Sequence, residues 1–228
     1  MKKYGSCYLC DAPGTSREHA PPRCLFPEAK DLPPRVSFRE TLIKVDSCDE
    51  HNSKKSKDDE YLMWILSTAS RGNAHRQAHF QSKGMRTYRR RPETFLRLLE
   101  NLTPVLLPSV DGTLRETALF EVDLSRFNKC MWHTATALFF HQTGNKWSGE
   151  CRVFTDAFVH LKGPDAEAMN KTLFEGTQRI AKALKDVPAQ GENPEIFTYK
   201  VFSGQASQHA VHIVFYEDIQ VAVLLGDA

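Results

Sequence analysis

The sequence predicts an α+β protein, in which a small metal-stapled module at the N-terminus is followed by an α+β domain that ends in antiparallel strands. Three observations lead to this prediction. Cysteine and histidine pairs with the spacing of metal ligands lie within the first 52 residues. Stretches with helical apolar periodicity follow. Residues 196–225 then form short β-rich runs that are separated by turn residues.

The N-terminal segment contains two short pairs of candidate ligands. Cys7 and Cys10 form a C-x2-C pair, and Cys48 and His51 form a C-x2-H pair. Two such pairs suit one tetrahedral zinc ion, because burying thiolates on the ion stabilises a loop-rich stretch that has little core of its own. We therefore predict a structural zinc site at these four side chains.

The residues around the second pair predict a hairpin and then a helix. Residues 35–38 and 41–45 are short extended pieces. A helix is expected to begin near Cys48, which would place Asn52 in its first turn. Residues 58–60, all acidic, are expected to form a solvated face of this helix. Its apolar stripe follows the spacing i, i+3, i+4, i+7 and comprises Leu62, Ile65, Leu66 and Ala69.

The rest of the chain predicts a second domain. Pro92 is expected to open a short helix, and the Pro- and Gly-containing residues 101–113 are expected to connect the domains. We therefore expect an N-terminal module over residues 1–100 and a second domain over residues 114–228. The elements expected in the second domain are a buried helix that ends before Thr143-Gly144, a helix over 164–186, and strands over 196–202, 210–216 and 219–225.

Charge is distributed unevenly along the chain. Residues 1–92 contain 18 Lys and Arg against 11 Asp and Glu, whereas residues 93–228 contain 12 against 17. Residues 61–92 contain no acidic residue at all. A basic stretch of this kind favours contact with a polyanion such as the phosphate backbone of a nucleic acid. The phosphate contacts that we predict are Lys54, Lys55, Arg86, Arg89, Arg90 and Arg91.

Composition limits the cellular setting. The chain is 41% hydrophobic and 25% charged, which is ordinary for a soluble globular protein. It has no apolar run long enough to span a membrane and no signal-peptide-like start, so we expect a cytoplasmic protein without a membrane partner. In that compartment the six cysteines favour metal ligands and core thiols over disulfides.

The order of motifs between residues 4 and 65 resembles a known family. Glu18-His19 lies between the two ligand pairs and is followed by Pro21 and Pro22, while Asn52 directly follows His51 and Lys55 lies three residues further on. This arrangement resembles the HNH endonucleases, in their zinc-stapled treble-clef branch with a ββα-metal fold. The resemblance covers about a quarter of the chain.

The resemblance implies a metal-dependent endonuclease of bacterial type that hydrolyses DNA. His19 would be the general base, and Glu18 and Asn52 would hold a catalytic Mg²⁺ or Mn²⁺. The chemistry of the residues agrees with these roles, because an imidazole accepts a proton near neutral pH and hard oxygen donors suit Mg²⁺. A homodimer would supply two such sites for cutting both strands.

Two alternatives remain open from the sequence. The family usually carries a middle Asn that steadies the base, and none lies between His19 and Asn52. This departure favours a non-catalytic, zinc-dependent nucleic-acid-binding protein. In the other alternative the chain is an interaction or sensor protein, whose C-terminal domain is the working part.

Overall fold

The computed structural model describes residues 4–52, 55–108, 112–204 and 208–226, and it confirms the predicted α+β class. None of the helices in these ranges combines the length and apolar character that a bilayer crossing requires. The helices are α1 (Ser56–Thr68), α2 (Ala74–His79), α3 (Met85–Arg90), α4 (Pro92–Leu99), α5 (Leu124–Thr143) and α6 (Ala166–Ala183). A π-helical turn, Phe80–Gly84, joins α2 to α3.

Among the described residues, the strands pair antiparallel and form three sheets. The first sheet pairs β1 (Ser16–His19) with β2 (Lys44–Ser47), and the second pairs β3 (Thr103–Pro108) with β4 (Leu114–Leu119). The third has the order β5-β9-β8-β7-β6, and its strands are β5 (Cys151–Thr155), β6 (Gln190–Asn193), β7 (Phe197–Ser203), β8 (His209–Phe215) and β9 (Ile219–Leu225).

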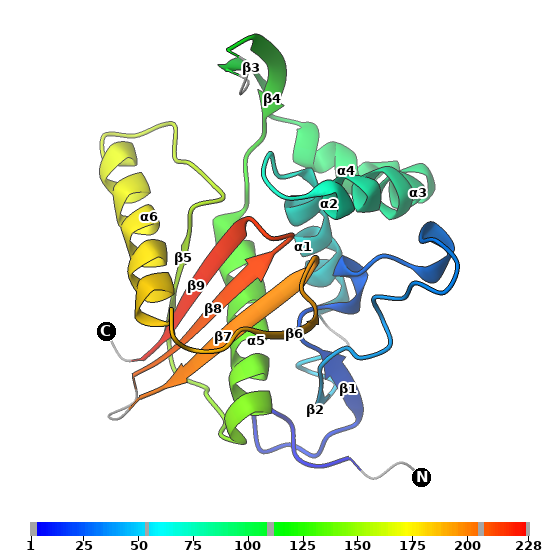
Figure 1. Ribbon diagram of the computed structural model, residues 1–228, viewed down its shortest axis with the longest axis vertical. Coiled ribbons are helices and arrows are strands. Elements are labelled where there is room, and N and C mark those ends of the chain that lie inside the picture. Colours follow the sequence, from blue (N-terminus) through cyan, green and yellow to red (C-terminus); the bar gives the residue numbers. More distant parts are fainter. Residues whose placement is uncertain (1–3, 53–54, 109–111, 205–207, 227–228) are drawn as a thin grey trace.

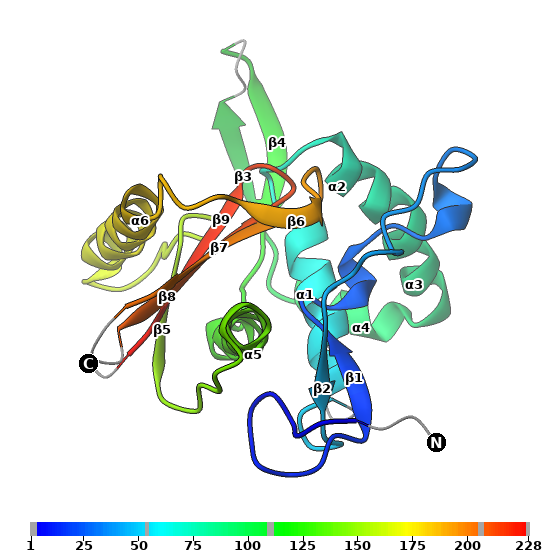
Figure 2. The ribbon, with the colours of Figure 1, turned by 60° about the horizontal axis from the view of Figure 1, so that its bottom comes forward.

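The predicted C-terminal strands are confirmed as β7, β8 and β9. A tight turn at Glu217 and Asp218 joins β8 to β9, as their spacing predicts, and Glu217 there has a positive φ of 64°. Most side chains of β8 and β9 are buried. The reason is visible in Figure 2, where α5 and α6 lie on opposite faces of the sheet.

The buried helix predicted to end before Thr143-Gly144 is α5, whose last residue is Thr143. Asp123 caps its start by accepting a hydrogen bond from the backbone NH of Arg126 (2.9 Å), and Gly144 ends it in the left-handed conformation (φ 73°). One face of α5 packs on the five-stranded sheet, and the helix also contacts α1 and β2. Apolar side chains therefore line both sides of α5, including Phe127, Met131, Ala135, Leu138 and Phe139.

The two predicted domains share one hydrophobic core. The cluster of buried residues runs without interruption from Tyr8, through Trp64 in α1, to α5 and the five-stranded sheet. Polar contacts cross the same boundary. The Tyr8 hydroxyl hydrogen-bonds His133 Nδ1 (3.1 Å), and Arg126 Nε donates to Asp58 Oδ1 (2.7 Å).

Three sequence predictions about local structure are wrong. Residues 35–38 form no strand; β2 pairs instead with the Glu18 segment. The helix expected near Cys48 begins only at Ser56. Within residues 101–113, expected as a connection, residues 103–108 form strand β3, which pairs with β4 in a hairpin that extends away from the rest of the molecule (Figures 1 and 2), and residues 109–111 lie outside the described residues.

Candidate functional site

The four predicted ligands come together in one cluster. Their ligand atoms all lie within 4.8 Å of one another. Nδ1 of His51 is 3.5 Å from Sγ of Cys7, 3.5 Å from Sγ of Cys10 and 3.3 Å from Sγ of Cys48. Sγ of Cys10 and Sγ of Cys48 are 3.8 Å apart.

These separations fit a tetrahedral metal centre. With Zn–S bonds of about 2.3 Å and a Zn–N bond of about 2.0 Å, a tetrahedron has S···S edges of about 3.8 Å and S···N edges of about 3.5 Å. The three S···N distances and the Cys10–Cys48 S···S distance match these edges. The four residues therefore form a possible metal-binding cluster that is consistent with zinc.

The turn after Cys48 explains why α1 starts late. The backbone NH groups of His51 (3.2 Å) and Asn52 (3.1 Å) both donate to the carbonyl of Cys48, so the chain folds back before it becomes helical. This turn brings His51 to the Cys7-Cys10 pair. Asn52 consequently lies in the turn that precedes α1, and not in the first turn of the helix as predicted.

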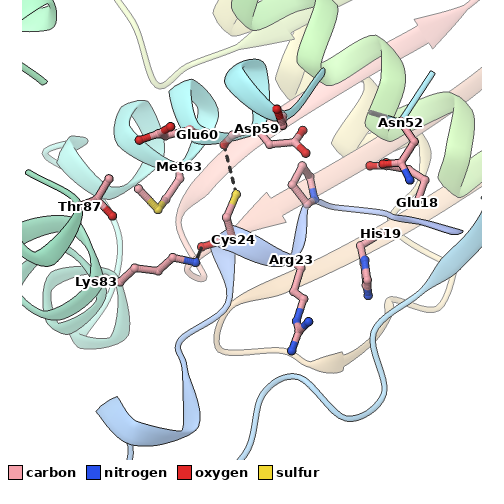
Figure 3. Close-up of a pocket in the computed structure, with 12 residues that line it drawn as sticks. Glu18, His19, Arg23, Cys24, Asn52, Asp59, Glu60, Met63, Lys83 and Thr87 are labelled. Carbon is pink, nitrogen blue, oxygen red and sulfur yellow. Dashed lines mark hydrogen bonds between the residues drawn. The ribbon is translucent and has the colours of Figure 1, made fainter. Parts of the chain in front are cut away.

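A cavity of about 360 Å³ lies beside β1 and α1, and we call it the Glu18 cavity. Side chains from β1, from the following 3-10 turn Arg23–Leu25, from α1 and from the π-helical turn surround it (Figure 3). All three predicted catalytic residues line it. Its charged and polar lining includes Glu18, His19, Arg23, Asn52, Asp59 and Lys83.

Glu18 is buried because it is an inward-facing residue of β1. Neighbouring residues of a strand point to opposite faces, so Arg17 is exposed while Glu18 is only 4% exposed. Lys55 Nζ lies 2.7 Å from Glu18 Oε1. Burial raises the pKa of Glu18 to about 7 although the nearby Lys55 ammonium lowers it.

His19 is half-buried at the end of β1. Burial lowers its pKa below the usual value of 6.5, and the positive charges of Lys44 and Arg23 act in the same direction. The imidazole is therefore mostly neutral at pH 7, which is the form that accepts a proton.

Asn52 is held against β1 by its amide nitrogen. Nδ2 donates to Ser16 Oγ (2.7 Å) and to the carbonyl of Arg17 (3.4 Å). Because the nitrogen is used in this way, the amide oxygen is the atom that would contact a cation.

Two acidic residues of α1 are not the solvated face that the sequence predicts. Asp59 lines the Glu18 cavity, and its Oδ1 lies 2.5 Å from Lys55 Nζ. Asp58 instead pairs with Arg126 (2.7 Å) and Lys129 (3.4 Å) of α5. The i, i+4 spacing of Lys55 and Asp59 was a signal for the first contact, but the position of Glu18 beside them depends on the tertiary fold.

Two basic residues of the cavity were also missed. Arg23 is exposed and follows the Pro21-Pro22 step closely, and Lys83 comes from the π-helical turn. Lys83 Nζ donates to the carbonyl of Cys24 (3.2 Å) and lies 3.7 Å from Glu28. Both residues bring positive charge to the cavity that holds His19.

The structure divides the predicted phosphate contacts into two groups. Lys54 lies outside the described residues. Lys55 is buried between two carboxylates, so its prediction as a surface contact is wrong. Arg86 is largely used in ion pairs with Asp31 (2.5 Å) and Glu28 (3.1 Å). The side chains that remain exposed are Arg89, Arg90 and Arg91, and for these the prediction stands untested.

His79 is a buried residue that holds the Cys24 segment of the cavity wall, and its burial makes the stability of the protein depend on pH. Its Nε2 donates to the carbonyl of Cys24 (3.0 Å), and its buried Nδ1 has no hydrogen-bond partner in the described parts of the chain. Burial lowers the pKa of His79 from 6.5 to about 4. Below pH 6.5 the imidazole of His79 is protonated in the unfolded chain but stays neutral in the folded protein. The free energy of unfolding therefore falls as the pH drops from 6.5 toward 4.

This loss is expected to reach about 2 kcal/mol at about pH 5 and is measurable by urea denaturation at about pH 7 and about pH 5. His79→Gln should reduce the difference between the two conditions by that amount. His141→Gln, at an exposed histidine, should leave the difference unchanged. An equal pH dependence in wild type and His79→Gln would contradict the prediction.

The chain was compared with protein-family models, curated proteins and solved structures. No protein-family model, no curated protein and no solved structure matches the chain.

Proposed function

We propose that this protein is a metal-dependent endonuclease that hydrolyses phosphodiester bonds of DNA in the Glu18 cavity. The observation that carries the proposal is the convergence of Glu18, His19 and Asn52 on one cavity. The three residues come from two segments that are separated by more than 30 positions in the chain. Zinc at the cluster of Cys7, Cys10, Cys48 and His51 would hold these segments together as a structural ion.

His19 is the proposed general base. Its lowered pKa keeps the imidazole neutral at pH 7, so it can take a proton from a water molecule that attacks the phosphorus atom. Arg23 and Lys83 add positive charge near the same place, where negative charge builds up on the phosphoryl oxygens. The exposed residues Arg89, Arg90 and Arg91 would contact the phosphate backbone and make binding sensitive to salt.

The oxygen donors of the cavity fit Mg²⁺ or Mn²⁺. Glu18 supplies a carboxylate, Asn52 an amide oxygen and Asp59 a second carboxylate, and hard cations prefer such ligands. When bound, the ion would polarise the phosphate and stabilise the leaving oxygen. The thiolate-rich cluster would keep zinc, because the two sites differ in the softness of their ligands.

Nicking of supercoiled plasmid tests the proposal. In Mg²⁺ or Mn²⁺, we expect the wild type to nick DNA and His19→Ala at equal zinc content to lose about 10²–10⁴-fold of the rate, since that is what a general base contributes. His141→Ala is the matched control, because His141 is an exposed histidine that does not line the Glu18 cavity.

One observation favours the non-catalytic alternative. Glu18 is already paired with Lys55, as it would be in a domain that binds nucleic acid without cleaving it. Salt-sensitive binding by the wild type with no scission of DNA or RNA would establish that alternative and reject the nuclease.

A further inference from the structure

Lys55 is a buried cation held between two carboxylates. Its Nζ lies 2.7 Å from Oε1 of Glu18 and 2.5 Å from Oδ1 of Asp59. The side chains of Lys55 and Glu18 are only 7% and 5% exposed, and that of Asp59 is 24% exposed. When both carboxyl groups are ionised, the two carboxylates and one ammonium carry a formal charge of −1.

Three different constraints place the trio. Lys55 immediately precedes α1, and its backbone NH donates to the carbonyl of Asn52 (3.2 Å). Asp59 lies one helical turn further on, and Glu18 is fixed by the pairing of β1 with β2. Carboxylate oxygens from two elements thus converge on one position, and the ammonium group occupies it.

Converging carboxylate oxygens are also what a divalent ion requires, and Asn52 lines the same cavity as Glu18 and Asp59. Glu18 and Asp59 cannot both remain ionised in this partly buried position without a cation, because an uncompensated buried charge is strongly destabilising. An ammonium and a divalent ion can each meet this need, but their mutual repulsion disfavours both at close range. The two cations are therefore alternatives for the same carboxylates.

We infer that Lys55 is the resident counter-cation of Glu18 and Asp59, two carboxylates that line the Glu18 cavity, and that it competes with the catalytic divalent ion for them and is displaced when that ion binds. The inference rests on the proposed function for the presence of the divalent ion. It assigns Asp59 as a further ligand beside Glu18 and Asn52. It also gives Lys55 the role of keeping the metal-free protein folded.

Binding of Mn²⁺ to the zinc-loaded full chain, followed by electron paramagnetic resonance, tests the competition. Lys55→Gln removes the competing charge and keeps a hydrogen-bond donor, so we expect it to bind Mn²⁺ about tenfold more tightly than the wild type. Lys57→Gln removes the same charge from an exposed position two residues away and should change the constant less than about twofold. An unchanged or weaker constant in Lys55→Gln overturns the inference.

A second measurement uses the wild type and does not depend on the stability of a variant. Acetylation of lysine side chains by a small reagent, quantified by mass spectrometry, reports how accessible Lys55 is. Saturating Mg²⁺ should raise the labelling rate of Lys55 about fivefold or more and leave that of Lys57 unchanged. Labelling of Lys55 that Mg²⁺ leaves unchanged or suppresses overturns the inference.

These outcomes separate the inference from the proposed function. Tighter Mn²⁺ binding by Lys55→Gln with no plasmid nicking by the wild type supports the competition and rejects the nuclease. Nicking with an unchanged Mn²⁺ constant in Lys55→Gln rejects the competition alone. Absence of Mn²⁺ binding in both proteins rejects the competition and the catalytic ion together.

Discussion

Replacing Cys48 with serine is expected to release one metal ion per chain and to lower the free energy of unfolding by about 4 kcal/mol or more. Cys48 is 7% exposed, and its Sγ lies close to His51 Nδ1 and Cys10 Sγ, so its loss opens the tetrahedron. Metal-binding energy contributes directly to folding in such modules. Elemental analysis for zinc and thermal denaturation, with an expected drop of roughly 10 °C or more, check the result.

Cys151→Ser is the matched control. Cys151 is a half-buried cysteine of the edge strand β5, outside the cluster, and burial raises the pKa of its thiol to about 11. Its replacement should leave the zinc content unchanged. Full zinc occupancy in Cys48→Ser, with a wild-type melting temperature, would show that the four side chains do not form a metal site.

Phe127→Ala is expected to destabilise the protein by about 3–5 kcal/mol, because removal of this ring of α5 leaves a cavity in the hydrophobic core. Phe127 is fully buried, and its ring packs against that of Phe158 with centroids 4.8 Å apart. Since one core joins the N-terminal module to the sheet, unfolding should remain a single transition, and zinc should be released within it. Urea denaturation that is followed by circular dichroism and by a zinc-sensitive dye measures both.

Phe174→Ala is the matched control, because it removes the same kind of side chain from an exposed position. This side chain of α6 is 54% exposed, so its loss should change stability by less than about 0.5 kcal/mol. Two separate transitions in Phe127→Ala, with zinc retained through the first, would show that the N-terminal module, predicted over residues 1–100, unfolds separately from the sheet.

The sequence predicts the elements better than their connections. The helical stripe of α1, the strands β7 to β9 and the end of α5 at Gly144 follow from local periodicity and turn residues, and all are present. The β1–β2 pairing does not follow from the sequence pattern, because Ser16–His19 consists of polar and charged residues and has no apolar alternation. The shared core was missed because periodicity shows which face is apolar but not which partner covers it.

The sequence likewise predicts one part of the candidate site, the ligand cluster, but not the other, the buried position of Lys55. The spacing of Cys7, Cys10, Cys48 and His51 identifies a cluster that the structure brings together. Lys55 shows the limit of sequence reasoning, because a lysine in a basic segment is most often a surface charge, and its burial depends on carboxylates from two elements. No local pattern reports that β1 delivers Glu18 to the start of α1.

The β3–β4 hairpin has a consequence for how the protein can be cut and rejoined. It extends from the body with Leu106 and Leu114 56% and 66% exposed, while the core continues from α1 to α5 beneath it. Cutting the chain at the hairpin would therefore leave the core packing between α1 and α5 in place. New chain ends placed there would leave two fragments that associate through α1 and α5, which makes the hairpin the natural point for fragment complementation or circular permutation.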